Sequence, residues 1–448
     1  MFILLLIPAA IAVWWMQQHT SASTLVNVYI PALFLFPLYF ELRLKGLPPV
    51  NDAQAVMIVF AVYILLRHRH ELYFSTTDIW VCFGVYGLML SETFRTGINT
   101  GIFTFAGDIC SALLPYLCGK LFIEQYGQRT AMLKRICWLL VLVAIGSLYE
   151  FRLEVNPYHQ FIAPYFENQG SSWIMQTRWG HGRISGPYAH AIIAGMMFLT
   201  GVLFNLWLLR FHKWESSFRF FRFKWAAKGP IIMFILVFGE FMTQSRGPWL
   251  GLAFGFAVSL IGFANNTRRA FFRFVVIGSL LFAFSYPFVN EYTGGAGGTT
   301  YTAQDKDQEN VIYRRILIQN YTPVVEAGGL WGWGVTQFPI VDKQNSIDNE
   351  YLYLGVTRGY FGLSVFILLC TDVLFSLIRT GVSFYDREDR LFAFCMVGVI
   401  SGVLFSITTV YLGNQMYDLL FLLFGWSQAI GRKRGGVDAP PVFRKVIA

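Results

Sequence analysis

Long apolar runs separated by short polar turns limit how this chain can fold more than any other feature of its sequence. An α-helix needs about 20 apolar residues to cross the hydrocarbon core of a bilayer, where only helices and closed barrels satisfy their backbone hydrogen bonds. We therefore predict an all-α, polytopic integral membrane protein with about 12–13 transmembrane helices. The predicted spans are residues 2–16, 23–41, 53–66, 77–92, 102–123, 136–150, 187–209, 230–243, 248–264, 271–290, 351–378, 391–412 and 414–430.

Composition supports this class of protein. Of the 448 residues, 55% are hydrophobic and 14% are charged, whereas soluble domains carry about 25% charged residues. The six cysteines fall in or beside apolar runs without metal-ligand spacing, so we expect neither a disulfide framework nor a metal site. The first apolar run lacks a basic n-region and a small-residue cleavage site, so we expect a retained span and not a signal peptide.

Basic turns set the expected orientation. The loop at 210–228 holds six Lys/Arg residues and one Glu, and further basic groups follow at 268–273, 379–390 and 432–434. The positive-inside rule places these turns in the cytoplasm. Aromatic residues within the first loop would also fit nucleic-acid binding, but a juxtamembrane basic loop with aromatic anchors already explains them. We therefore take the net charge of +9 as a sign of topology and expect membrane lipid, not nucleic acid, as a partner.

The same pattern divides the chain into six parts. They are the N-terminal transmembrane helices at 1–150, an outer loop at 151–186, central helices at 187–290, a large outer loop at 291–350, C-terminal helices at 351–430 and a cytoplasmic basic tail at 431–448. The turn at 244–247 also faces outward.

The loop at 291–350 is the longest polar interruption in the sequence. It holds eight acidic and four basic residues, so we expect it to cover a water-accessible site. Its glycine-rich stretch at 294–298 follows no strand and precedes no Lys-Ser/Thr pair, which argues against a nucleotide-binding loop.

Three short groups on the expected outer face carry arginines. These are residues 179–187 with Arg183, residues 243–249 with Arg246, and residues 313–317 with Arg314 and Arg315. Outward arginines at span ends are uncommon. Each could snorkel toward a carboxylate or a lipid phosphate. Together, with Gly or Ser beside them, they would suit a pyrophosphate, because a guanidinium binds phosphate oxygens in pairs and keeps its charge.

Asp348 precedes a predicted span and has two compatible interpretations. It could cap the helix N-terminus, or its carboxylate could take a proton from an attacking hydroxyl. The histidines His159, His181 and His190 are alternative bases.

These residues resemble the superfamily of O-antigen ligases and Wzy-type polysaccharide polymerases, from about Tyr149-Glu150 to Gly362. The motifs that carry the resemblance are Arg183-x-x-Gly186, Ser245-Arg246-Gly247, and Arg314 followed by Gly332-Trp333-Gly334, Asp348-Asn349-Glu350-Tyr351-Leu352 and Gly359-Tyr360-Phe361-Gly362. The resemblance implies a GT-C-like membrane glycosyltransferase in the bacterial inner membrane, with its site facing the periplasm. Such an enzyme uses a glycan on undecaprenyl pyrophosphate as donor and a second glycan as acceptor. It needs neither a nucleotide sugar nor a metal cofactor, and a flippase and a chain-length regulator would be its partners.

The resemblance also implies roles for individual residues. Asp348, Arg246 and Arg314 would be catalytic, and the expected substrate-binding residues are Arg183, Arg315, Asn349, Glu350 and His181. The ligase branch usually has histidine where this chain has Asp348. This departure favours a polymerase of exopolysaccharide or O-antigen repeat units over a ligase acting on lipid A-core or another acceptor. The Asp348 carboxylate would act as base, and attack opposite the pyrophosphate would invert the anomeric centre.

A transporter of an anionic solute is the alternative from another class. It is disfavoured because few ionisable residues lie mid-span and no pair of broken helices recurs in two halves.

Overall fold

The computed structural model describes residues 2–166, 169, 175–215, 227–292, 306–341, 344 and 346–432. Most of the basic loop at 210–228, the glycine-rich stretch at 294–298 and nearly all of the basic tail lie outside the described residues.

Helices make up nearly all of the regular secondary structure among the described residues. The α-helices are α1 (Ile7–Gln18), α2 (Ser21–Thr24), α3 (Ile30–Leu35), α4 (Asp52–Tyr63), α5 (Thr76–Thr96), α6 (Ile98–Asp108), α7 (Leu114–Phe122), α8 (Arg129–Leu153), α9 (Pro157–Phe161), α10 (Ala191–Arg210), α11 (Lys228–Met242), α12 (Arg246–Leu260), α13 (Thr267–Tyr292), α14 (Lys306–Gly328), α15 (Glu350–Ser383), α16 (Arg387–Ser406) and α17 (Asn414–Arg432). Short 3-10 or π-helical segments are η1 (Phe2–Leu6), η2 (Leu25–Tyr29), η3 (Ile64–His68), η4 (Arg69–Glu71), η5 (Ile109–Leu113), η6 (Ala163–Tyr165) and η7 (Ile261–Phe263). Strands β1 (Thr177–Arg178) and β2 (His181–Gly182) form one antiparallel hairpin.

Every predicted span coincides with a helical run, which confirms the all-α, polytopic class. Seven of the described helical runs are long and apolar enough to cross a membrane by length and composition, and two shorter apolar helices precede them. The predicted span at 102–123 is one continuous run from Ile98 to Phe122, made of α6, η5 and α7. The seven helices that meet these criteria of length and hydropathy are fewer than the predicted 12–13. The difference arises because α4, α5, α11 and α17 are too short or too polar to meet the criteria.

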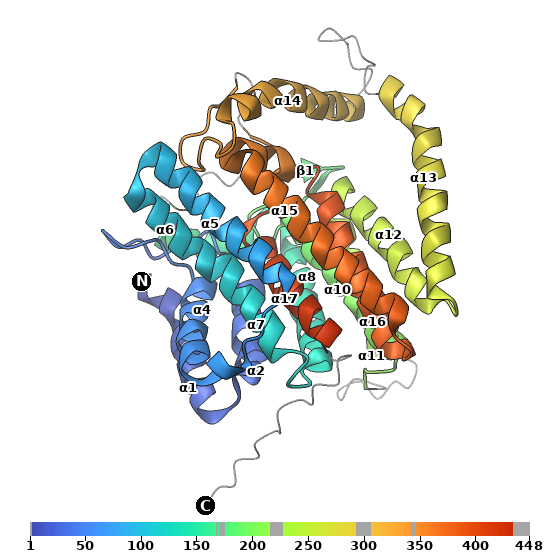
Figure 1. Cartoon of the computed structure of the whole chain (residues 1–448), viewed down its shortest axis with the longest axis horizontal. Helices are drawn as coiled ribbons and strands as arrows, with labels where there is room; N and C mark the ends of the chain where they lie inside the picture. Colours follow the sequence, from blue (N-terminus) through green and yellow to red (C-terminus); the bar gives the residue numbers. More distant parts are fainter. Residues whose placement is uncertain are drawn as a thin grey trace, which may run out of the picture.

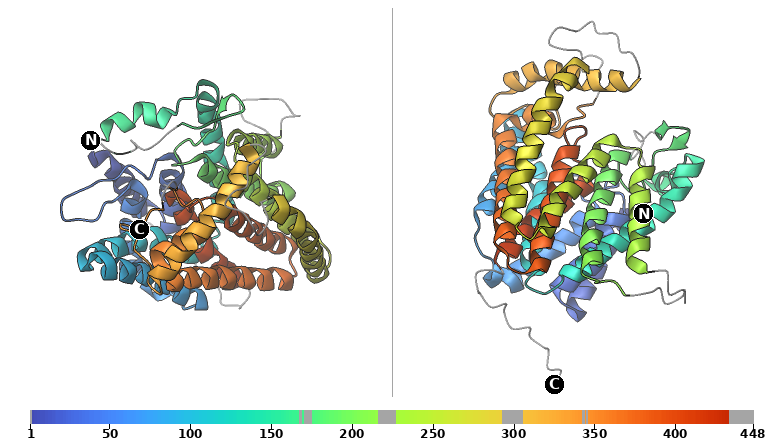
Figure 2. Two further views of the ribbon diagram at one scale, coloured as in Figure 1. Left: turned by 90° about the horizontal axis from the view of Figure 1, so that it is seen from above. Right: turned by 90° about the vertical axis from the view of Figure 1, so that its right-hand side faces the viewer.

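The long helices lie side by side in one bundle, and α14 crosses one end of it (Figure 1). Figure 2 shows the same helix running over that end when the molecule is seen from above. We call this the α14 end. The helices α10, α12 and α15 begin at the α14 end, whereas the described turns from α12 to α13 and from α15 to α16, which hold basic groups of 268–273 and 379–390, lie at the opposite end (Figure 1).

The sequence pattern did not predict α14, because its segment was taken as a polar loop. The helix is amphipathic: Leu317, Tyr321 and Val325 form an apolar stripe at helical spacing. This stripe packs against Ile347, which precedes α15, and against Val356, which lies within the first two turns of α15. The contact fixes α14 across the beginning of α15.

Glycines after α14 allow its return loop to lie directly on α15. Gly359 interrupts α15 with φ +65°, and a Cβ on Gly332 would lie 2.5 Å from the Gly359 backbone nitrogen. The amide nitrogens freed by this break donate outward: Tyr360 N bonds Gly329 O at 3.1 Å. Only glycine fits both positions without strain or overlap, so these motif residues hold α14 in place.

The loop is also held from α5. The Glu92 carboxylate is fully buried and accepts hydrogen bonds from the Val335 backbone nitrogen and the Thr336 hydroxyl. Arg95 donates to Gly332 O at 2.8 Å and lies over the Trp333 ring at 4.6 Å. These contacts occupy the backbone groups of a loop that would otherwise leave them unpaired.

Candidate active site

The turn between α11 and α12 is the centre of the candidate site. Arg246 is the first residue of α12, and its side chain is exposed at the α14 end. Pro248 lies in the same first turn, where the missing backbone N–H costs no helical hydrogen bond. The N-terminus of a helix carries a partial positive charge and unpaired N–H groups, and both favour an anion beside Arg246.

Arg183 reaches this turn from the preceding loop. Its Nε donates to Thr243 O at 3.3 Å and its Nη2 donates to Ser245 Oγ at 2.9 Å. The guanidinium therefore lies against the residue that precedes Arg246. Burial and the charge of Arg178 lower the pKa of Arg183 to about 10, so the group remains protonated at neutral pH.

A buried carboxylate explains why the chain folds this way at Arg183. Glu150, near the end of α8, is fully buried. Its Oε1 accepts from Ser185 N at 3.0 Å and from Asn156 Nδ2 at 3.0 Å, and its Oε2 accepts from Gly186 N at 2.8 Å. Gly186 has φ +57°, where a side chain would be strained. The Arg183-x-x-Gly186 group is thus tied to α8 through backbone amides.

Arg178 is a residue that the sequence analysis missed. It lies on β1, and its Nη1 donates to Gln244 O at 2.7 Å, in the same turn that Arg183 contacts. Two residues of tight turn, Trp179 and Gly180, separate the paired strands. The sequence signal was present, because Arg178 and Arg183 flank a Trp-Gly turn, and a hairpin brings both flanks to one place.

Arg314 approaches from α14, above the turn. Its pKa is lowered mainly by burial and further by the charges of Arg178 and Arg246, whereas Asp348 acts in the opposite direction. These influences place Arg314 within the electrostatic range of all three groups. Its neighbour Arg315 points about 100° further around the helix. Because the charges of Arg178, Arg246 and Asp348 all act on Arg314, we assign Arg314 of this pair to the cluster.

Asp348 faces the same cluster and is not the helix cap. The cap of α15 is Asn349, whose Oδ1 accepts from Leu352 N at 3.0 Å. The capping interpretation of Asp348 is therefore wrong. The Asp348 Oδ1 instead accepts from the Ser346 hydroxyl at 2.7 Å. Capping by Asn349 leaves the neighbouring carboxylate available for chemistry.

Asn349 and Glu350, both expected to bind substrate, use their polar atoms within the protein. The Asn349 Nδ2 donates to Thr408 O at 3.0 Å. The Glu350 side chain is buried, and its Oε2 accepts from Leu412 N at 2.6 Å. These bonds join the start of α15 to the connection between α16 and α17, so the geometry favours structural roles for both residues.

Three histidines were candidate bases, and the structure separates them. The His181 ring stacks on Phe151 with centroids 4.6 Å apart. The His159 Nε2 is 3.1 Å from the Tyr39 hydroxyl. Both Arg183 and Asp348 influence the pKa of His190. His190 therefore lies within electrostatic range of the cluster.

His190 is suited to donating a hydrogen bond and poorly suited to acting as a base. It caps α10, and its Nδ1 accepts from Ile192 N at 3.1 Å. The single proton of the neutral ring must then lie on Nε2. Burial, followed by the charge of Arg183, lowers the pKa of His190 to about 4. Asp348 is thus the better candidate for a base.

The cluster therefore gathers four arginines (Arg178, Arg183, Arg246 and Arg314) and one carboxylate (Asp348) at the α14 end. Several guanidinium groups converging at a helix N-terminus suit a diphosphate or another polyanion. A carboxylate beside them can accept a proton from a hydroxyl group.

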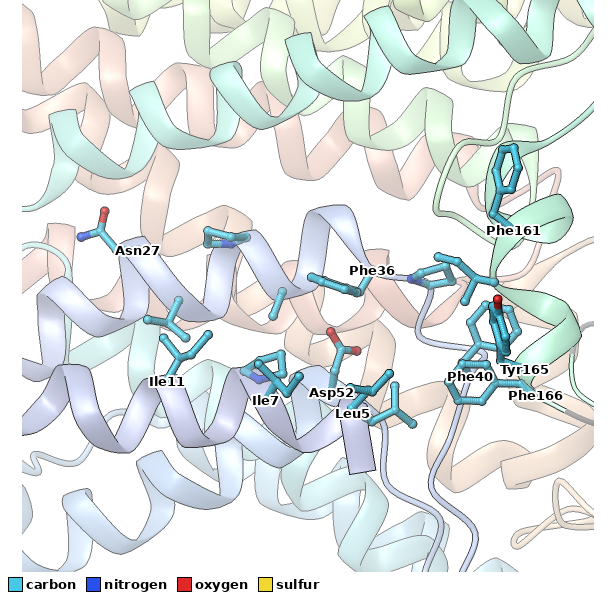
Figure 3. Close-up of a pocket in the computed structure, with 17 residues that line it drawn as sticks. Leu5, Ile7, Ile11, Asn27, Phe36, Phe40, Asp52, Phe161, Tyr165 and Phe166 are labelled. Carbon is cyan, nitrogen blue, oxygen red and sulfur yellow. The ribbon is translucent and has the colours of Figure 1, made fainter. Parts of the chain in front are cut away.

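A cavity of about 500 Å³ lies elsewhere, among the N-terminal helices (Figure 3). Its walls are mainly apolar side chains, including Ile7, Ile11, Phe36 and Phe40, and Asp52 supplies a carboxyl group. None of the candidate site residues lines this cavity. The arginine cluster is therefore a separate feature at the α14 end.

Comparison with known proteins favours the enzyme class over the transporter. Residues 231–367 match the O-antigen ligase family. This match confirms the resemblance that the sequence motifs indicated, and it indicates an enzyme of the O-antigen ligase and polymerase type in a multi-pass membrane protein. The matched segment contains Arg246, Arg314 and Asp348, whereas Arg178 and Arg183 precede it. No curated protein matches the chain.

Proposed function

We propose that the protein is a polymerase that joins oligosaccharide repeat units carried on undecaprenyl pyrophosphate. The observation that supports this proposal is that the charges of Arg246 and Asp348 both act on Arg314, although the three residues come from separate segments of the O-antigen ligase match. A lipid-linked diphosphate donor requires positive charge around its leaving group. It also requires a group that accepts the proton of the incoming hydroxyl.

The proposed reaction forms one glycosidic bond and breaks one sugar–phosphate bond. An acceptor hydroxyl oxygen attacks the anomeric carbon on the face opposite the pyrophosphate, so the configuration inverts. Asp348 takes the hydroxyl proton as the new bond forms. Undecaprenyl pyrophosphate leaves with the bonding electron pair, and Arg246, Arg314 and Arg183 stabilise the charge that develops on it. The leaving group is already activated, so the proposed mechanism needs no nucleotide sugar and no metal.

In this proposal the α14 end faces the periplasm of the inner membrane. The basic turns at the opposite end support that orientation by the positive-inside rule. A flippase would deliver the donor to this side, and a chain-length regulator would be a further partner.

Ligation to lipid A-core or another acceptor is the second candidate, and the family description as O-antigen ligase favours it. Asp348 favours polymerisation, because the ligase branch usually has histidine there.

Turnover by purified protein in lipid vesicles separates these functions. With an undecaprenyl-pyrophosphate-linked repeat unit as the sole substrate, a polymerase releases undecaprenyl pyrophosphate and forms a ladder of glycans. A ligase releases it only after lipid A-core is added. If neither condition releases undecaprenyl pyrophosphate and the vesicles instead accumulate an anionic solute, the proposed function is wrong.

A further inference from the structure

A row of aromatic rings leads along α11 to the arginine cluster. Phe234 and Phe238 have centroids 6.2 Å apart, and Phe238 and Phe241 have centroids 6.4 Å apart. The row continues from Phe241 to Trp249 at 5.6 Å and from Trp249 to Trp179 at 5.9 Å. We call these five residues the aromatic row.

The aromatic row lies on the outer surface of the helical bundle. Phe234 is 70% exposed and Phe241 is 50% exposed, while the other side of α11 packs against α8 and α10. The three phenylalanines follow helical spacing and rise about 10 Å along α11. In a membrane this face contacts hydrocarbon, and its upper end reaches the α14 end of the bundle.

The two tryptophans join the row to the cationic site. Trp179 directly follows Arg178, and Trp249 lies one turn after Arg246. Trp249 is fixed by its Nε1, which donates to Glu240 O at 2.9 Å. Trp179 is 56% exposed and has φ +53°, a conformation that costs energy for a bulky residue. The hairpin thus holds a strained, exposed ring where the row meets the arginines.

We propose that the aromatic row binds the polyisoprenoid chain of the lipid-linked donor while the arginine cluster binds its pyrophosphate. This inference rests on the proposed function, because it takes the donor to be a polyprenyl diphosphate. The occupant must carry a strongly anionic group at the α14 end and a hydrocarbon chain directly below it. The arginines supply the complementary charge for a diphosphate.

The chemistry of the row favours a branched, unsaturated chain. Aromatic rings have electron-rich faces, which attract the weakly positive hydrogens of methyl groups and of other ring edges. A polyisoprenoid presents such methyl groups at regular intervals. Neighbouring rings in the row have centroids 5.6–6.4 Å apart, so successive rings contact successive parts of one extended chain.

Binding of the carrier alone tests this inference without requiring sugar transfer. The measurement is the dissociation constant of undecaprenyl pyrophosphate for the full-length protein in nanodiscs, compared with a two-unit isoprenoid pyrophosphate and with phosphatidic acid. The variants are Phe238→Leu with Phe241→Leu, which keep the surface apolar but remove two rings. The matched control is Phe375→Leu on α15, where the ring is 66% exposed but outside the row.

We expect the double variant to weaken binding of undecaprenyl pyrophosphate about tenfold. Binding of the short pyrophosphate and of phosphatidic acid should not change, and the Phe375 control should bind all three as the wild type does. The inference is overturned if wild-type protein binds the long and short pyrophosphates equally well, or if the double variant weakens all three lipids alike. The first result would mean that the row contacts only bulk lipid, and the second that the substitutions act through the arginine cluster and not through the hydrocarbon chain.

The outcome is independent of the proposed reaction. If the wild type binds undecaprenyl pyrophosphate through the row but transfers no sugar, the proposed function fails and the inference stands. If it polymerises glycan but shows no preference for the long chain, the inference fails and the proposed function stands.

Discussion

At the scale of single residues, the proposed diphosphate site depends on arginine geometry. Arg246 stands at the N-terminus of α12 with Arg183 and Arg178 bonded to the turn before it. A guanidinium offers two parallel N–H groups to a diphosphate, whereas an ammonium is a point charge. Replacement of Arg246 therefore tests whether charge alone is sufficient.

We predict that Arg246→Ala abolishes product formation and that Arg246→Lys recovers only part of it. Removing one donor that stabilises developing charge typically costs about 10²–10³-fold in rate. The measurement is the initial rate of undecaprenyl pyrophosphate release, with membrane insertion and thermal unfolding as checks on folding. Arg315→Ala, one residue after Arg314 on α14, is the matched control. Normal turnover in Arg246→Ala would assign that arginine a structural role.

His190 gives a prediction about pH. Its folded pKa of about 4 lies below the ordinary value of about 6.5, so the unfolded chain binds an extra proton between these values. The stability that the neutral ring contributes is present above pH 6.5 and is lost as the pH falls through about 4. Its slope is at most about 1.4 kcal/mol per pH unit.

His190→Asn should remove this pH dependence while preserving the cap, because Asn is a good N-cap residue. We expect the wild type to lose more unfolding free energy than the variant between pH 7 and pH 5, measured by denaturation in detergent. The pKa of His159 is also lowered to about 4. Because His159 is present in both the wild type and the variant, its contribution to the pH dependence cancels in the comparison. Parallel losses in the two proteins would contradict the assigned protonation state.

The sequence predicted the roles of some site residues better than those of others. Arg246 and Asp348 stand out because polar groups at span ends are rare. The choice between Asp348 and Asn349 as helix cap could not be made, because both side chains cap well and only the backbone geometry decides between them. Arg178 was missed because its role depends on a two-residue hairpin that neither hydropathy nor composition reveals.

At the scale of elements, close contact between α12 and α16 positions Arg246. Gly251 and Gly255 on α12 face Gly398 and Gly402 on α16, and a Cβ on Gly251 would lie 2.5 Å from Gly402 O. Small residues four apart let two membrane helices approach at backbone distance. This contact fixes α12 against α16, which also packs against α15.

We predict that Gly251→Ala destabilises the protein by about 1–3 kcal/mol, because the added methyl group pushes two backbones apart. Gly278→Ala on α13 is the control, since a Cβ there meets nothing within 4 Å among the described residues. The control should be neutral or slightly stabilising, given the better helix propensity of alanine. Thermal unfolding in detergent measures both, and equal melting temperatures for the two variants would contradict the packing argument.

Hydropathy predicted each membrane-crossing element, but it did not predict α14. Its many polar residues give the segment the composition of a loop, and its apolar stripe at 317, 321 and 325 becomes visible only when helical spacing is tested. The glycines at 332 and 359 marked the family resemblance in the sequence. The structure adds their physical reason, which is backbone-to-backbone contact.

At the scale of the whole molecule, the site combines parts far apart in the sequence. Arg178 and Arg183 lie on a hairpin, Arg246 on a span end, Arg314 on α14 and Asp348 before α15. The sequence predicted that these parts share one side of the membrane, but not that they converge. Convergence depends on which helices pack together, and apolar runs of similar composition do not specify that.

The placement of these site residues on one side of the membrane leads to a prediction about topology. Ser346 is exposed at the α14 end and Tyr385 is exposed in the turn between α15 and α16 at the opposite end. In a background lacking the exposed Cys82, a cysteine at position 346 should react with an impermeant maleimide in intact spheroplasts. A cysteine at position 385 should react only after lysis. The reverse pattern would overturn the proposed orientation of the site.

The most direct test of the whole account is the rate of glycan polymer formation by Asp348→Asn with the undecaprenyl-pyrophosphate-linked repeat unit. Asn cannot accept the hydroxyl proton, and Asn349 caps α15 in both proteins, so thermal stability should stay near that of the wild type. We predict a rate reduced by at least about 100-fold, the lower end of general-base contributions. Ser346→Ala, which removes only the hydrogen bond to Asp348, should retain most activity. Polymer formation by Asp348→Asn at the wild-type rate would contradict the account.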